Sequence, residues 1–315
     1  MAGGVDFNFT FGVVFILLEL SFRLSTMIKK ISIVTPLFNE ADNVTELCDR
    51  IANVMATLPY DYEHLCIDNC STDNTVSLLR ERTKHDPKLR VIINVRNFGY
   101  IRSSFHALLQ ASGDAAVLIA SDLQDPPEMI VEFIKQWEAG YKTVMATKPN
   151  SEESSLMFFI RKLYYKTIGR ISEVPLVPNA TGSGLFDRAV LNVLRELKDP
   201  YPYFRGLVCE IGYPIATVPF KQPKRLRGIT SQNFYSLYDM AMLGITKHSK
   251  LPLRIMTLFG FSIACLSLLI ASAYLVAKLL FWDSFEIGLA PILIGLFFFS
   301  SVQMIFLGML GEYVW

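Results

Sequence analysis

The stretch ISIVTPLFNE at residues 31–40 decides the fold, because a β-branched run typical of a strand leads directly into a polar loop. The same pattern recurs along the first half of the chain. Further strands are predicted at residues 64–68, 89–95 and 115–121. Helical periodicity separates the strands at residues 42–58, 74–83 and 101–111. Strands that alternate with helices of this size predict an α/β fold with a parallel, doubly wound sheet.

The loops after the four strands are the candidate ligand site, because such sheets bind ligands beyond the carboxyl ends of their strands. All four loops are polar: PLFNE at 36–40, DNCSTDNT at 68–75, RNFG at 96–99 and DLQDPPE at 122–128. Neither the glycine pattern of a dinucleotide site nor that of a P-loop is present in the sequence. Turn formation explains any single loop, but four such loops at one sheet edge favour a binding site.

Charge and cysteine content narrow the chemistry of this site. Acidic residues would repel a phosphate ligand unless a divalent cation lies between them, and oxygen ligands of this kind suit Mg²⁺ or Mn²⁺. The formal net charge of +1 gives no general attraction for nucleic acid, so a phosphate site must be local. Five scattered cysteines, without a C-x-x-C pair, indicate a reducing compartment and argue against zinc and disulfides.

The C-terminal end is apolar enough to predict a membrane anchor. The chain of 315 residues is 51% hydrophobic, with a mean hydropathy of +0.34. Uncharged runs lie between Arg254 and Lys278 and between Glu286 and Glu312. Each is as long as the roughly 20 residues that a bilayer core requires. These runs predict a transmembrane hairpin with spans at about residues 255–277 and 287–311.

The domain division follows from this hairpin. Lysine and arginine residues just before the first span place the preceding chain in the cytoplasm by the positive-inside rule. The predicted parts are an extension of uncertain role at 1–26, a catalytic domain at 27–230, an amphipathic interfacial connector at 231–250 and the hairpin at 251–315.

The order of these motifs closely resembles that of the polyisoprenyl-phosphate glycosyltransferases of glycosyltransferase family 2, which include bactoprenol glucosyltransferases and dolichol-phosphate mannose synthases. The resemblance covers about residues 27–315 and rests on SIVTPLFNE, IDNCSTDNT, VRNFGY, SDLQDPPE, a GLV…IGY segment and the apolar pair. It implies a GT-A fold, a nucleotide-sugar donor, a divalent metal and inverting transfer of one sugar to a lipid phosphate.

The resemblance also implies roles for residues of the first three loops. Pro36, Phe38 and Glu40 are expected to border the nucleoside. Asp68 is expected to accept a hydrogen bond from the edge of the base, and Asn97 to help close that pocket.

The metal motif of the family reads D-x-D-x-Q, and Ala120 replaces its first Asp in this chain. The expected metal contacts are therefore Asp122 and Gln124, with Asp125 as an additional carboxylate nearby. The second loop also departs from the family, with Asn69 where a second Asp is common.

A basic segment before the apolar runs is expected to bind the lipid phosphate. Arg205 and Arg225 are the predicted contacts, because guanidinium groups bind phosphate in a bidentate manner. Lys224 and Arg227 are left open between phosphate binding and a solvated basic face near lipid headgroups. For Asp187 a role as base is also open, but its place at the start of a predicted helix favours a cap.

Together with the predicted membrane anchor, the resemblance implies a metal-dependent enzyme at the cytoplasmic face of the inner membrane. The expected reaction is transfer of a hexose to undecaprenyl phosphate, with glucose from UDP-glucose as the first choice. The predicted catalytic residues are Asp122, Asp125, Arg205 and Arg225. Two alternatives stay open. A processive polysaccharide synthase lacks support because there is no Q-x-x-R-W motif, and a non-catalytic membrane scaffold would need no intact metal site. Sugar, donor base and acceptor length are not decided, nor is homo-oligomerisation.

Overall fold

The computed structural model describes residues 29–148, 174, 176–199, 202–221, 239, 242–244, 246–247, 249–281 and 289–314. The chain divides into two compact units, which are residues 1–151 with 178–229 and residues 152–177 with 230–315. The predicted N-terminal extension, Arg225 and most of the predicted connector lie outside the described residues.

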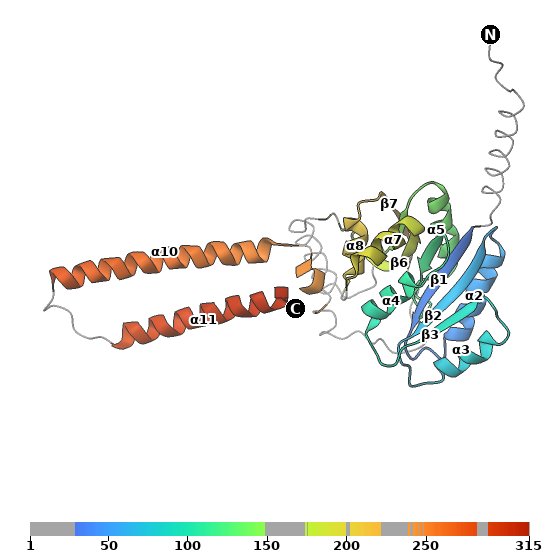
Figure 1. Cartoon of the computed structure of the whole chain (residues 1–315), viewed down its shortest axis with the longest axis horizontal. Coiled ribbons are helices and arrows are strands. Elements are labelled where there is room, and N and C mark those ends of the chain that lie inside the picture. The colour runs from blue at the N-terminus through green and yellow to red at the C-terminus, as the bar shows by residue number, and fades with distance from the viewer. Residues whose placement is uncertain are drawn as a thin grey trace, which may run out of the picture. The chain divides into compact units, whose positions relative to one another are not determined.

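The first unit is built on one seven-stranded sheet (Figure 1). Its strands are β1 (Lys30–Leu37), β2 (Asp61–Asp68), β3 (Leu89–Ile93), β4 (Ala115–Leu118), β5 (Thr143–Thr147), β6 (Ala180–Asp187) and β7 (Ile215–Pro219). They lie in the order β3-β2-β1-β4-β6-β5-β7. The four strands predicted from the sequence pair in parallel. However, β6 runs antiparallel to both β4 and β5, so the sheet is mixed and the prediction of a wholly parallel sheet is wrong.

Glycine explains why β6 can occupy this place. A Cβ at Gly184 would overlap the carbonyl oxygen of Val144 in the neighbouring strand β5. Only glycine therefore allows the two backbones to approach this closely. The segment ATGSGLFD lacks the β-branched alternation of an ordinary strand, because close backbone packing replaces side-chain packing here.

Helices cover both faces of the sheet, as predicted for a doubly wound fold. On one face lie α2 (Val44–Ala56) and α5 (Met129–Glu138), which contribute Leu47, Ile51, Ile130 and Phe133 to a shared core. On the other face lie α4 (Tyr100–Leu109), α7 (Arg188–Leu197) and α8 (Phe204–Glu210). The remaining helix of this unit, α3 (Thr75–Thr83), packs Leu79 against β2 and β3.

The first strand continues beyond the residue at which the sequence predicts its end. Pro36 lies inside β1, opposite Ile67 of β2. The carbonyl oxygen of Val34 accepts a hydrogen bond from Ile119 N–H on the side of β4. The backbone groups of Pro36, two residues later, point to the same side. Pairing with β4 ends at Val34, so the missing N–H of Pro36 removes no hydrogen bond from the ladder.

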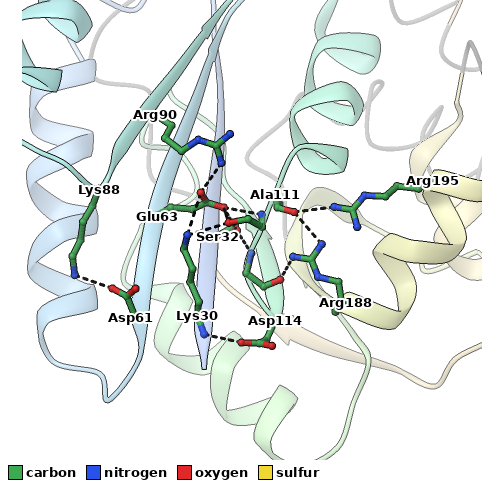
Figure 2. A network of polar contacts seen from close by, with 12 residues as sticks. Lys30, Ser32, Asp61, Glu63, Lys88, Arg90, Ala111, Asp114, Arg188 and Arg195 are labelled. Atoms are coloured by element: carbon green, nitrogen blue, oxygen red, sulfur yellow. Dashed lines mark hydrogen bonds and ion pairs between the residues drawn. The ribbon is translucent and has the colours of Figure 1, made fainter. Parts of the chain in front are cut away.

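A buried carboxylate joins the strands at the amino end of the sheet (Figure 2). Glu63 of β2 is 3% exposed and accepts hydrogen bonds from Ser32 Oγ at 2.6 Å and Arg90 Nη1 at 2.7 Å. It also accepts from the N–H and hydroxyl of Ser112, both at 2.7 Å, and Lys30 Nζ lies 3.5 Å away. Although burial opposes the change, these hydrogen bonds lower the pKa of Glu63 to about 2.

The second unit contains two long helices, α10 (Leu251–Leu280) and α11 (Leu289–Val314), at the positions of the two apolar runs. The two helices contact each other, and the end of α11 lies near the start of α10. Near its end, the Tyr313 hydroxyl donates a hydrogen bond to the carbonyl oxygen of Ser249 at 2.7 Å.

The apolar surface of these helices is exposed. Leu258 and Phe261 of α10 and Met304 of α11 are among the many large side chains left uncovered. Within the described residues, no helix combines the length and the apolar character that a membrane span requires. The predicted spans at 255–277 and 287–311 are therefore unsupported by these residues.

The Glu63 network makes a prediction about stability. Glu63→Gln removes the buried charge and leaves Arg90 and Lys30 without their carboxylate, so the free energy of unfolding should fall by about 2–4 kcal/mol. Chemical denaturation of the full chain measures this. As a control, Asp61→Asn in the same strand removes only an exposed ion pair with Lys88 and should cost less than about 1 kcal/mol. Equal losses in the two variants would contradict the assignment.

The same network makes the stability depend on pH. The pKa of Glu63 is lowered from 4.5 to about 2 on folding, so its contribution is complete above the unfolded value. That contribution should disappear as the pH falls from about 4.5 toward about 2. The Glu63→Gln variant should lose less stability than the unmodified chain over this interval.

Candidate functional site

The polar loops meet at the carboxyl ends of the parallel strands, as the sequence predicts. We call this side of the sheet the catalytic edge. In the paired strands Leu37 lies opposite Asp68, and Asp68 lies opposite Ile93. The loops that follow β1, β2, β3 and β4 therefore leave from the same edge. Because β6 is antiparallel, it begins at this edge, with Gly184 opposite Leu118.

The loops after β1 and β2 are joined by hydrogen bonds. Asn39 has a φ of 55°, a left-handed conformation that asparagine tolerates. Its N–H donates to Ser71 Oγ at 2.9 Å, and its Oδ1 accepts from the N–H of Thr72 at 2.8 Å. The N–H of Ala41 donates to Asp73 Oδ2 at 3.1 Å. The two loops consequently form one continuous polar surface.

Asn69 joins the loop after β2 to the loop after β3. Its Nδ2 donates to Asn97 Oδ1 at 2.8 Å, and its Oδ1 accepts from Asn94 Nδ2 at 3.1 Å and from the N–H of Phe98 at 3.0 Å. A carboxylate at this position would lack the donor that Asn97 receives. The departure of Asn69 from the family pattern therefore has a structural use, and it fixes the place of Asn97.

Asp68 is the most deeply buried of the predicted nucleotide contacts. It is 0% exposed, and its Oδ2 accepts from the N–H of Ser71 at 2.9 Å. Its Oδ1 has no hydrogen-bond partner in the described part of the chain. An unpaired buried oxygen of this kind costs about 1–3 kcal/mol, so a ligand that donates to it would recover that cost.

The other predicted nucleoside contacts are placed differently from one another. Phe38 is 37% exposed and presents its ring at the edge of the sheet. Pro36 is buried within β1. Glu40 is also buried, and its Oε2 accepts from Asn43 Nδ2 at 2.6 Å at the start of α2. Of these three residues, only Phe38 offers an exposed apolar face to a base.

The loop after β4 holds the predicted metal contacts. Asp122 Oδ1 accepts from the N–H of Gln124 at 3.1 Å, and Leu123 between them has a φ of 57°. Asp125 is 4% exposed, and its Oδ2 accepts a hydrogen bond from the Ser183 hydroxyl at the start of β6. Its Oδ1 has no partner among the described residues.

Burial of Asp125 and the nearby charge of Asp122 raise the pKa of Asp125, while Ser183, Thr181 and Arg205 oppose this change. Two carboxylates in a partly buried environment repel each other. A divalent cation would reduce this repulsion and would also give the unpaired oxygen of Asp125 a partner. The residues present therefore fit a cation such as Mg²⁺ or Mn²⁺. Asp125 also supplies a second carboxylate where Ala120 has none.

Arg205 and Tyr100 complete the cluster. Arg205 of α8 donates from Nη2 to the carbonyl oxygen of Thr181 at 2.6 Å. Tyr100 is at the start of α4 and is partly exposed, yet burial at its hydroxyl and the charge of Asp125 raise the pKa of Tyr100. Sequence reasoning missed Tyr100 and Ser183. Tyr100 ends the motif VRNFGY, which is a signal that could have identified it. Ser183 could be placed beside Asp125 only once the order of the strands in the sheet was known.

Asp187 lies at the other end of β6 and acts as a helix cap. Its Oδ1 accepts from the N–H of Ala189 at 2.9 Å, and its Oδ2 accepts from Trp137 Nε1 at 2.8 Å. It pairs with Ala115 at the amino end of β4, far from the polar loops. The cap interpretation is therefore confirmed, and Asp187 is not a catalytic base.

Residues 32–194 match the protein family described as glycosyl transferase family 2, and this match takes in the whole cluster except Arg205. The chain belongs to glycosyl transferase family 2. Within this family it is an enzyme that transfers a glycosyl group, and its mixed α/β domain agrees with the GT-A architecture expected from the sequence.

Relatives of this family 2 enzyme match along most of its length. A glycosyltransferase from Synechocystis sp. is 34% identical over 90% of this chain and 90% of its own. A bactoprenol glucosyl transferase from Shigella phage SfV is 31% identical over 90% of this chain and 93% of its own. A solved structure, glucosyl-3-phosphoglycerate synthase from Mycobacterium tuberculosis with Mn²⁺ and UDP-glucose, is 20% identical, with a TM-score of 0.47, covering 69% of this chain and 78% of that one.

The unpaired oxygen of Asp68 makes a prediction for this family 2 enzyme. Asp68→Asn keeps the shape of the side chain but offers a donor where a base would also donate. UDP, the nucleotide predicted from the sequence, should therefore bind to this variant about tenfold more weakly. Isothermal titration calorimetry measures the dissociation constant. Asp61→Asn, at the other end of the same strand, should leave it unchanged. Equal affinities for all three proteins would mean that the base does not contact Asp68.

Proposed function

We propose that this enzyme transfers glucose from UDP-glucose to a polyisoprenyl phosphate, with inversion at the anomeric carbon. The observation that carries the proposal is the similarity to bactoprenol glucosyl transferases of Shigella phages, which extends over 90% of this chain. The polar groups that lie together at the catalytic edge, with buried oxygens able to bind a ligand, support an active enzyme. They also disfavour a scaffold, which would gain nothing from leaving Asp68 and Asp125 with unpaired buried oxygens.

The acceptor sets the catalytic task. A phosphate monoester has a second pKa of about 6, so it is an anion at neutral pH and attacks without a strong general base. The protein must instead bring two anionic groups together, the acceptor phosphate and the donor diphosphate, in line with the anomeric carbon. Arg205 suits the acceptor phosphate, because among the described residues only one of its five N–H groups donates a hydrogen bond, to the carbonyl oxygen of Thr181. Arg225 remains the second predicted contact.

The donor is held at both ends. Phe38 would stack on the base while Asp68 accepts a hydrogen bond from its edge. A divalent cation, Mg²⁺ or Mn²⁺, would be held by Asp122, with Gln124 and Asp125 beside it, and would neutralise charge on the leaving diphosphate. Ser183 keeps the Asp125 carboxyl in place from the neighbouring strand.

We further propose that the enzyme works at the cytoplasmic face of the inner membrane and that the apolar side chains of α10 and α11 contact lipid. Long uncharged runs form both helices, and large apolar side chains on them are exposed. Exposed apolar surface of this extent is unfavourable in water. A polyisoprenyl chain also stays in the bilayer, since each buried CH₂ contributes about 0.8 kcal/mol. The catalytic edge must then reach the headgroups.

Glycosyl transfer is tested by incubating the full chain with undecaprenyl phosphate, a panel of nucleotide sugars and Mg²⁺, followed by mass spectrometry of the lipid. We expect a glucosylated lipid from UDP-glucose and no product with EDTA. Asp122→Asn should lower the rate at least about 100-fold, because leaving-group stabilisation is lost. Asp61→Asn should behave like the unmodified enzyme.

The outcomes of this assay separate the parts of the proposal. A lipid product from another nucleotide sugar would correct the donor only. Transfer that continues at full rate in excess chelator would contradict the cation. A product with several sugars in a growing chain would instead favour a processive synthase.

Membrane contact is tested by flotation of the full chain with vesicles of anionic lipid in a density gradient. We expect the protein to float with the vesicles even at high salt, because apolar contact is not screened by ions. Protein that stays at the bottom would contradict lipid contact. Protease protection of the vesicle-bound chain then distinguishes helices that cross the bilayer from helices that lie on it.

A further inference from the structure

Three side chains with metal-binding atoms meet in the interior of the first unit, apart from the candidate active site. Cys48 comes from α2, while His64 and Cys66 alternate along β2 and so point to the same side of the sheet. Their exposed fractions are 3%, 3% and 0%. One ligand atom from each lies within 4.8 Å of the other two.

We propose that Cys48, His64 and Cys66 bind a thiophilic cation with a filled d shell, Zn²⁺ or Cu⁺. Neither the family resemblance nor the proposed transfer reaction assigns such a site. Soft thiolate sulfur and imidazole nitrogen are the donors that these two ions prefer. The cation of the transfer site is different, since Mg²⁺ and Mn²⁺ prefer the oxygen atoms found near Asp122.

The spacing of the donors suits such an ion. Zinc binds sulfur at about 2.3 Å and nitrogen at about 2.0–2.1 Å, which places neighbouring donors roughly 3.5–4 Å apart. His64 Nε2 already lies 3.4 Å from Cys66 Sγ. Thr35 Oγ1 is 3.1 Å from the same nitrogen. Only small side-chain movements are therefore needed to surround an ion with the three donors.

The charge balance also suits a cation. An isolated charge in the interior is costly, but Zn²⁺ held by two thiolates would leave no net charge there. Binding would release the protons of the two thiols, because cysteine binds a metal ion as the thiolate.

The position of the site suggests what an ion would do there. It would tie α2 to β2 just before Asp68, the residue that ends β2 at the catalytic edge. Thr35 in contact with His64 belongs to β1, which leads to Phe38. The ion would stabilise the strands that carry the nucleotide loops, so its role would be structural and not catalytic. With three protein donors, Cu⁺ would be satisfied, whereas Zn²⁺ would retain one open position.

The test uses the full chain, freed of metal and kept reduced, with Co²⁺ as a spectroscopic probe of the Zn²⁺ arm. We expect one Co²⁺ per chain with sulfur-to-metal charge-transfer absorption, displaced by Zn²⁺. For the Cu⁺ arm, competition with a colorimetric Cu⁺ chelator should give one bound ion per chain. The preferred ion should raise the melting temperature measured by scanning fluorimetry.

Matched variants locate the ion. Cys48→Ser and Cys66→Ser should each weaken binding at least about 100-fold, because a thiolate ligand is lost. Cys209→Ser, another buried cysteine, and Asp122→Asn should keep the full signal. If a ligand variant does not fold, the spectrum and the melting shift of the unmodified chain still decide. The proposal is overturned if neither ion binds, if Cys48→Ser binds as tightly, or if the isolated chain carries a Cys48–Cys66 disulfide.

Discussion

The buried charge of Glu63 is the constraint on which the first unit depends. A carboxylate in the interior must be paired, and the partners of Glu63, which lies in β2, come from β1, β3 and the turn before β4. These contacts fix how the strands are aligned. Alignment matters because a shift of one residue would turn every side chain to the opposite face. The same alignment fixes the position of Asp68 at the other end of β2.

The two ends of the sheet treat polar atoms in opposite ways. At the amino end, the side chain of Glu63 is fully hydrogen-bonded and contributes to stability. At the carboxyl end, Asp68 and Asp125 each keep one buried oxygen without a partner among the described residues. The stability that the amino end contributes thus offsets a cost of about 1–3 kcal/mol for each unpaired group at the carboxyl end. This asymmetry is what a preorganised binding site requires.

The sequence allowed much of the fold to be predicted, because local patterns produced it. The β-branched runs of β1 and β2, and the polar loops after them, needed no knowledge of distant contacts. The place of β6 depended on a close backbone approach at Gly184, which leaves no hydrophobic pattern. The Ser183–Asp125 contact was hidden for the same reason. The cluster of Cys48, His64 and Cys66 was missed because its members come from two elements and form no spaced motif.

The antiparallel direction of β6 has a consequence for how this enzyme can change over evolution. The chain leaves β5 at Thr147 and returns at Ala180 on the same edge of the sheet, where Lys148 N–H donates to the carbonyl oxygen of Asn179. The two ends of the connection between β5 and β6 are therefore held together by strand pairing. Substitutions in this connection can accumulate without changing the pairing of β1, β2 and β4, the strands that lead to Asp68 and Asp122.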